Sequence, residues 1–172
     1  MLGGAPALLD AGAGLMTQRR ARGAEEARAM SEPKQLAYAR SVLQAQPFSV
    51  LLGTEILAFG PALTELRLAL RPELKQQHGF AHGGVLSYLA DNALTFAGGS
   101  ALSDAVVTAE YKINYVRPAQ GDTLLARARV LHGGKRQAVC ACEIFAIDAE
   151  GGEKLVAVAQ GTISAMGERP AV

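Results

Sequence analysis

The chain has 172 residues, enough for one domain with a substantial core and too few for two ordinary domains. Its net charge is +1, and no basic stripe with interleaved aromatic residues is present, so neither a nucleic acid nor an anionic membrane surface is expected as a partner. No apolar run reaches the ~20 residues that a membrane-spanning helix requires.

Residues 1–30 are dominated by Ala, Gly and Arg, and we predict a disordered extension there, with an Arg-rich organellar presequence as the alternative. Ser31-Glu32-Pro33 is typical of a helix start, because it combines a capping hydroxyl, an early acidic residue and a proline in the first turn. An N-terminal helix is therefore predicted within residues 31–48, ending near Gln44 and before Pro47. Residues 49–166 form the predicted globular domain, and residues 167–172 form a tail.

The domain begins with a predicted hairpin, in which the strands Thr54–Phe59 and Leu63–Leu70 meet at Gly60-Pro61. His82–Ala97 is predicted to be a helix that is apolar on nearly all sides and stops at Gly98-Gly99. A helix of this kind belongs in a core.

Four further strands are predicted after this helix, separated by turns that contain Gly or Pro: Ala105–Val116, Asp122–Leu131, Gln137–Ile147 and Lys154–Ala165. Alternation in the first of them places five residues on one face: Val107, Ala109, Tyr111, Ile113 and Tyr115. Short connections between successive strands predict an antiparallel meander. The predicted fold class is α+β, with a curved antiparallel sheet wrapped around one long central helix.

The sequence gives no support for a disulfide, a metal site, a serine-hydrolase elbow or a phosphate-binding loop. Cys140 and Cys142 lie two residues apart on a predicted strand, where they are poorly placed to bridge, so we predict buried, reduced thiols in a cytoplasmic protein. His78 and His82 have no third metal ligand near them in sequence, whereas zinc sites need at least three. Neither a Gly-x-Ser-x-Gly elbow nor a phosphate-binding loop occurs. No metal or other cofactor is therefore expected.

Asp91 is the one formally charged residue between Lys75 and Asp104, and it lies midway along the most apolar predicted helix. A lone carboxylate there is costly to desolvate, which favours a functional role. Steps of four residues give the stripe Gly83, Ser87, Asp91 and Thr95, small and polar residues through which a ligand could reach the helix. The structural alternative is a carboxylate satisfied by neighbours such as Thr95, or one that faces a solvent channel.

Gly83 and Gly84 begin the same helix and present backbone N–H groups that suit a developing oxyanion, although a tight turn would also explain two glycines. Eight residues separate Gly83 from Asp91, which corresponds to roughly 12 Å along a helix. Catalytic groups must lie within roughly 3–3.5 Å of the reacting atoms. One helix cannot supply both groups to the same carbonyl, so the prediction is a dimer in which each site combines Asp91 of one subunit with Gly83 of the other.

Two segments resemble the PaaI-like (phenylacetate-type) hotdog thioesterases. They are His78-Gly79-x-x-His82-Gly83-Gly84-Val85-Leu86-x-x-Leu89-x-Asp91 and Asn114-Tyr115-x-Arg117-Pro118-Ala119-x-x-Gly121-Asp122. The likeness extends from about Ser49 to Ser164. It implies hydrolysis of a medium-chain or aryl acyl-CoA to the free acid and CoA by a homodimer or homotetramer without a metal.

The resemblance also implies roles for individual residues. Asp91 would act as general base or nucleophile, the Gly83 N–H of the partner subunit would polarise the thioester carbonyl, and Thr108 would orient water. Gln76 stands where many members carry Asn, and its extra methylene alters its reach. The remaining predicted substrate contacts are His82, which shapes the loop, and Gly84, Ser87, Lys135 and Arg136, the last two as candidates for the CoA phosphates.

Two rival functions remain open at this stage. A hotdog enoyl-CoA hydratase or dehydratase needs a paired acid and base, and His82 and Asp91 could pair only between chains. A non-catalytic acyl-CoA-binding module needs a pocket but no functional carboxylate, so the presence of Asp91 counts against it.

Overall fold

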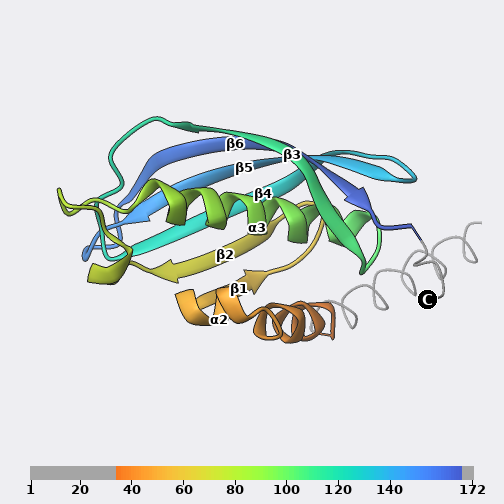
Figure 1. Cartoon of the computed structure of the whole chain (residues 1–172), viewed down its shortest axis with the longest axis horizontal. Helices are drawn as coiled ribbons and strands as arrows, with labels where there is room; N and C mark the ends of the chain where they lie inside the picture. The colour runs from red at the N-terminus through yellow and green to blue at the C-terminus, as the bar shows by residue number, and fades with distance from the viewer. Residues whose placement is uncertain (1–33, 168–172) are drawn as a thin grey trace, which may run out of the picture.

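The computed structural model describes residues 34–167. An antiparallel sheet curves around the long helix α3 (Gly83–Ala101), which confirms the predicted hotdog fold (Figure 1). Its strands are β1 (Thr54–Ala58), β2 (Thr64–Ala69), β3 (Val106–Tyr115), β4 (Thr123–Gly133), β5 (Gln137–Ile147) and β6 (Glu153–Ala165). The predicted extension 1–30 and nearly all of the predicted tail 167–172 lie outside the described residues.

The strand order is β1-β2-β4-β5-β6-β3, so the prediction of a four-strand meander is wrong for its first connection. Strands β4, β5 and β6 do form a meander, but β3 pairs with β6 and lies at the edge of the sheet. The connection 116–122 must pass β6 and β5 to reach β4, about 14 Å at the usual strand spacing. Seven residues can span roughly 23 Å, so loop length does not decide which strands pair.

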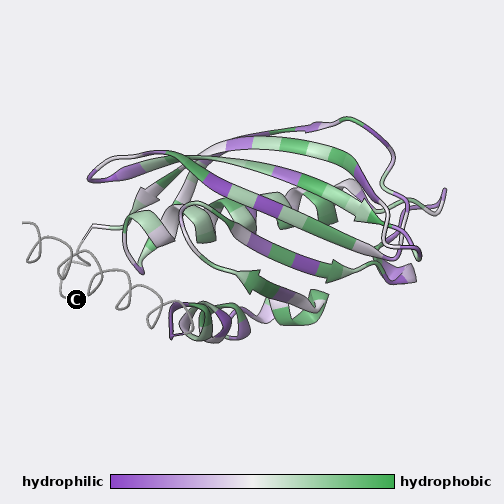
Figure 2. Ribbon diagram, turned by 180° about the vertical axis from the view of Figure 1, so that it is seen from behind, coloured by the Kyte–Doolittle hydropathy of each residue, from purple (hydrophilic) through white to green (hydrophobic). Residues whose placement is uncertain are grey.

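The two faces of the sheet differ in character. The inner face packs against α3, where Ala90, Ala93 and Ala97 are fully buried and allow a close approach to the strands. Hydrophilic residues interleave with hydrophobic ones along the strands in the view from behind (Figure 2). On the outer face Arg127 pairs with Glu65 and Glu153. This alternation is what a sheet with one dry face and one wet face requires.

Helix α3 does not stop at Gly98-Gly99 as predicted but continues to Ala101. Gly98 serves packing instead: a Cβ atom there would lie 2.5 Å from Cβ of Ile163 on β6. The helix therefore crosses the sheet too closely at this point for any side chain. A glycine required by close packing and a glycine that ends a helix look the same in the sequence.

Gly98→Ala is therefore expected to lower the free energy of unfolding by roughly 1–3 kcal/mol, because overpacking outweighs the gain in helix propensity. Gly99→Ala is the matched control, since its Cβ would meet its nearest neighbour, Val106 Cγ2, at 3.4 Å. Urea unfolding at equal protein concentration measures both variants. Equal midpoints for the two variants would contradict this account of Gly98.

Strand β3 also departs from the predicted alternation. A bulge between Thr108 and Glu110 shifts the register of β3 against β6. Even-numbered residues therefore face the helix before the bulge, and odd-numbered residues face it after the bulge. Thr108 faces α3 before the bulge and Tyr111 faces it after the bulge, whereas Val107 is exposed. The predicted shared face is thus wrong for Val107 and for Ala109, which is exposed in the bulge. The same bulge orients Thr108 toward the helix.

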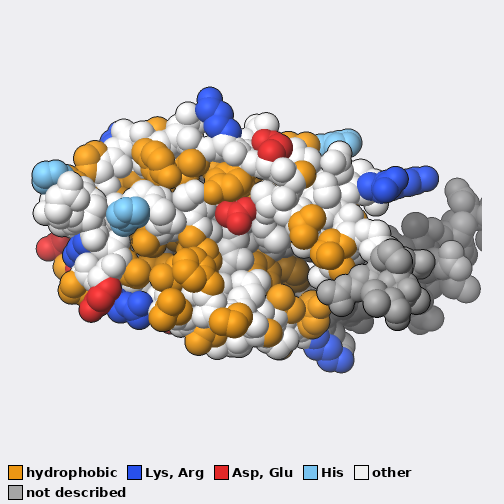
Figure 3. Space-filling view, in the orientation of Figure 1, with side chains coloured by type: hydrophobic (Ala, Val, Ile, Leu, Met, Phe, Trp, Pro, Cys, Tyr) orange, Lys and Arg blue, Asp and Glu red, His pale blue; other side chains and the backbone are white. Residues whose placement is uncertain are grey.

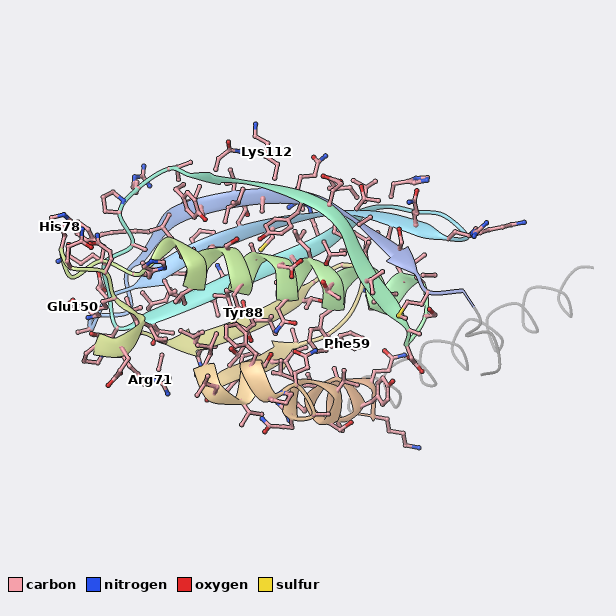
Figure 4. The ribbon with its side chains drawn as sticks, viewed as in Figure 1. Phe59, Arg71, His78, Tyr88, Lys112 and Glu150 are labelled. Carbon is pink, nitrogen blue, oxygen red and sulfur yellow. The ribbon has the colours of Figure 1, made fainter. Side chains whose placement is uncertain are left out.

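Residues 34–44 are helical, in agreement with the predicted end near Gln44, while the predicted start at Ser31–Pro33 lies outside the described residues. The short helix α2 (Pro47–Leu52) was not predicted. Pro47 is its first residue, a position where proline is tolerated because its missing N–H would have no partner. Ser49 of α2 is buried, and its hydroxyl accepts hydrogen bonds from Tyr88 (2.8 Å) and Asn92 (3.2 Å) of α3. Figure 4 shows Tyr88 between the two helices. This network fixes α2 against the central helix.

The cysteine prediction is confirmed, since Cys140 and Cys142 are buried and free. Burial raises the pKa of Cys140 to about 11 and, together with the charge of Glu143, that of Cys142 to about 12. Thiols with such pKa values stay protonated near neutral pH and are poor nucleophiles. Within residues 34–167, no helix is both long and apolar enough to cross a membrane.

Candidate active site

The Asp91 carboxylate is partly buried on α3 and accepts a hydrogen bond from one hydroxyl group. Thr108 of β3 donates a hydrogen bond to Asp91 Oδ1 at 2.7 Å. Thr95, one turn further along α3, donates to the Asp91 carbonyl oxygen at 2.8 Å, and its hydroxyl oxygen lies 2.8 Å from that of Thr108. The carboxylate is thus oriented by one hydroxyl and has no basic partner within the described part of the chain.

Strand β3 runs along the polar stripe of α3 and meets it at each turn. Tyr115 donates to the Gly83 carbonyl oxygen at 3.1 Å, and the hydroxyls of Tyr111 and Ser87 lie 2.5 Å apart. Thr108 makes the third of these contacts between β3 and α3, with Asp91. Ser87, a predicted substrate contact, is therefore engaged with Tyr111, and β3 is the element that orders the stripe.

His82 caps the N-terminus of α3. Its backbone is extended (φ −64°, ψ 137°), and its Nδ1 accepts a hydrogen bond from the Gly84 N–H at 3.0 Å. The Gly83 N–H, by contrast, has no acceptor among residues 34–167. Of the two glycines predicted as oxyanion donors, Gly83 is thus the one whose N–H is open, and the helix dipole favours negative charge beside it.

Gly83 opens into a groove of about 370 Å³ between the start of α3 and the chain that follows β3. Gln76 lines the same groove, and its amide oxygen accepts from the His78 N–H at 2.7 Å within a tight loop in which Gly79 has φ +81°. Arg117 also lines it and donates to the Leu155 carbonyl oxygen. The groove combines an open N–H group, an amide and a cation.

The predicted site residues thus form two separate groups within one chain. Gln76, His82 and Gly83 gather at the N-terminal end of α3, while Asp91 and Thr108 meet two helical turns further on. The rise of α3 keeps Gly83 and Asp91 roughly 12 Å apart along the axis. No single subunit brings the two groups to one reacting carbonyl.

Lys135 and Arg136 belong to neither group. Both are exposed in the β4–β5 turn, at the opposite end of the sheet from the start of α3 (Figure 1). They line a shallow hollow of about 680 Å³ together with His132 and Ser164.

Comparisons with known proteins show the family to which the chain belongs. Residues 78–153, which include Gly83, Asp91 and Thr108 but not Gln76, match the thioesterase superfamily. A crystal structure of a thioesterase family protein from Silicibacter pomeroyi has a TM-score of 0.69 and 32% sequence identity, and the alignment covers 74% of this chain and 94% of that one. The chain belongs to the thioesterase superfamily.

Two further matches of this chain are with PaaI. The acyl-coenzyme A thioesterase PaaI of Escherichia coli (strain K12) is 35% identical over 94 residues, which are 54% of this chain and 66% of PaaI. The structure of the E. coli PaaI protein from the phenylacetic acid degradation operon has a TM-score of 0.68 and 28% identity, covering 79% of this chain and 96% of that one. The predicted PaaI-like family is confirmed.

Three further residues lie at the candidate site, and the sequence alone gives no indication of their contacts there. The alternation places Tyr111 and Tyr115 correctly on one face of a strand, but it does not indicate that their hydroxyls form hydrogen bonds with Ser87 and Gly83 of α3. Arg117 belongs to the family motif in the sequence. Its position in the groove beside Gly83 depends on how the connection 116–122 crosses the sheet. Tyrosine carries a hydroxyl group at the end of an apolar ring, and a buried tyrosine hydroxyl usually finds a hydrogen-bond partner. Two tyrosines on the strand face that packs on an apolar helix could therefore have indicated these contacts.

Proposed function

We propose that this chain hydrolyses acyl-CoA thioesters to the free acid and CoA, with medium-chain or aryl acyl groups as substrates. The observation that carries the proposal is the Asp91 carboxylate on the most apolar helix, which Thr108 of β3 holds. Two turns away lies the Gly83 N–H, which has no acceptor in the described part of the chain. A carboxylate able to accept a proton and a donor placed for an oxyanion are the two groups that acyl transfer to water needs. Membership of the PaaI-like family supports the same reaction.

In the proposed reaction Asp91 accepts a proton from water as the water oxygen attacks the thioester carbonyl carbon. The partner subunit's Gly83 N–H stabilises the oxyanion. Collapse of the intermediate breaks the C–S bond, and the proton that Asp91 took from water passes to the sulfur, so CoA leaves as the thiol and Asp91 is again a carboxylate. Thr108 orients Asp91 and the water, while Gln76 and Arg117 hold the substrate beside the donor. An anhydride formed by direct attack of the carboxylate uses the same groups.

We further propose that the active unit is a homodimer, or a homotetramer built from two such dimers. The distance between Gly83 and Asp91 along α3 supports this, because a site needs both groups. The second support is β3, an edge strand with exposed Val107 and Tyr115, which is followed directly by exposed Val116. Hydrophobic side chains gather on the face that carries α3 (Figure 3). An open strand edge beside such a surface is a ready site for self-association.

Cytoplasmic location is also proposed, on the support of two free, buried cysteines. Lys135 and Arg136 remain proposed contacts for the CoA phosphates, possible only if CoA reaches the β4–β5 turn.

The function is tested by incubating the full chain with a panel of acyl-CoA thioesters and measuring the release of free thiol. We expect turnover of at least one medium-chain or aryl acyl-CoA. Crotonyl-CoA separates the rival reaction, since hydration removes its conjugated double bond without releasing a thiol. Hydration without thiol release would replace the proposal by a hydratase, and binding without either reaction would replace it by an acyl-CoA-binding module.

A further inference from the structure

A second cavity lies between the helical residues 34–44 and the C-terminal half of α3. It has a volume of about 120 Å³ and a largely apolar wall that includes Tyr38, Val42, Phe59, Phe96, Gly99 and Val106. Figure 4 shows Phe59 between the N-terminal helix and the end of α3. None of these residues has a role in the reaction described above, and the helix that covers the cavity lies outside the central helix and sheet.

The cavity lies next to Asp91, in the direction of the C-terminal end of α3. Thr95 lies on its wall, and the Thr95 hydroxyl is 2.8 Å from that of Thr108, which donates to Asp91. Gly99 follows Thr95 one turn further along α3, and Val106 precedes Thr108 by two positions on β3. A group that extends from a carbonyl at Asp91 toward the C-terminal end of α3 therefore enters this cavity.

The lining suits an apolar occupant of limited size. Phe59 and Phe96 pack edge to face with their ring centroids 6.1 Å apart, and Gly99 leaves the helix side open. An apolar cavity of about 150 Å³ is known to hold a benzene molecule, so the space here is that of one ring or a short chain. Tyr38 and Asp104 add polar groups to the lining, and desolvation and this carboxylate raise the pKa of the Tyr38 hydroxyl. A long alkyl chain would have to pass these groups.

The N-terminal helix is held firmly enough to form a wall. Ala39 and Leu43 are buried against the core, and Arg40 Nε donates to the Ile56 carbonyl oxygen on β1. Val42 is partly buried and turns toward the cavity.

We propose that the substrate's acyl group lodges in this cavity, and that Val42, Phe59 and Gly99 set the length of the acyl chain that the enzyme accepts. The proposal rests on the proposed thioesterase function and adds the part of the chain that selects the substrate. The choice of acyl chain then depends on the helical residues 34–44, which precede the catalytic domain and carry Val42.

Two substitutions change the cavity in opposite directions. Gly99→Ala fills part of it and is expected to lower kcat/KM for hexanoyl-CoA and benzoyl-CoA by roughly 10-fold, since one methylene in such a pocket is worth at least that. Acetyl-CoA, which does not reach Gly99, should change by less than about 2-fold. Val42→Ala enlarges the cavity and should raise kcat/KM for dodecanoyl-CoA relative to hexanoyl-CoA. Val50→Ala, an equal truncation at an exposed position of α2, is the matched control and should leave the profile unchanged.

The two proposals fail in different ways. If the wild-type chain releases thiol but Gly99→Ala and Val42→Ala keep the wild-type profile across the four substrates, the acyl group lies elsewhere and the thioesterase function stands. If the wild-type chain releases thiol from no substrate, the thioesterase function is overturned, and the acyl cavity with it. Opposite shifts in the two variants support the cavity as the acyl site.

Discussion

Asp91→Asn is expected to lower kcat for thioester hydrolysis by about 10³-fold, within the range that removal of a general base produces. The amide keeps the size of the carboxylate, and its oxygen can still accept the hydrogen bond from Thr108. It cannot take a proton from water or attack the carbonyl, so the loss is expected whether Asp91 is base or nucleophile. The rate of thiol release at saturating acyl-CoA measures the effect.

The control for this prediction is Asp122→Asn. Asp122 is exposed, and its backbone carbonyl oxygen accepts from the Leu70 N–H, a contact that the substitution leaves in place. Wild-type turnover is expected for this variant, and both variants should keep the unfolding midpoint and the size of the wild-type oligomer. Turnover of Asp91→Asn within tenfold of wild type would remove Asp91 from the chemistry.

Gly83→Pro is expected to lower kcat by roughly 10²–10³-fold, the cost of removing one oxyanion donor. Proline deletes the N–H group while it is tolerated as the first residue of a helix. The preceding residue already has the extended conformation that proline requires, with His82 at φ −64° and ψ 137°. A Cβ atom at Gly83 would meet no atom closer than 3.7 Å, on Tyr115. Gly83→Ala keeps the N–H group and is the matched control, expected to retain most of the activity.

The two inactive variants also test whether the site is shared between subunits. In a dimer of one Asp91→Asn chain and one Gly83→Pro chain, one site combines the intact Asp91 with the intact Gly83, and the other site has lost both. Random mixing of equal amounts should thus restore about one quarter of the wild-type activity per chain in a symmetric dimer. If Gly83 and Asp91 of the same chain acted together, every site in the mixture would lack one group. Activity no higher than that of the separate variants would then contradict the shared site.

Local features of the sequence were sufficient to predict the central helix and Asp91. A segment that is apolar around its whole circumference can be stable only inside a core, and a single carboxylate there stands out against its neighbours. The rise of a helix is constant, so the separation of Gly83 and Asp91 also followed from counting residues. The ends of β5 were predicted correctly because glycine turns lie close to both of them.

Other features depend on contacts between residues far apart in the chain. Gly98 lies inside α3 because Ile163 of β6 leaves no room for a side chain, and no local pattern reports that contact. The bulge in β3 turns Thr108 toward Asp91, and strict alternation had placed Val107 on the inner face instead. The position of β3 at the sheet edge contradicts the predicted meander, since a seven-residue connection can reach several neighbouring strands.

The same division applies to the site. The sequence by itself determined that Asp91 is an isolated carboxylate on an apolar helix and that Gly83 begins this helix. The tertiary structure decided which donors stay open, because the His82 side chain occupies the Gly84 N–H and leaves the Gly83 N–H without an acceptor among the described residues. It also decided that Thr108 holds the carboxylate and that a cavity lined by Thr95 lies beneath the N-terminal helix. Residue type and helical spacing are local properties, whereas open donors and cavities exist only where distant segments pack together.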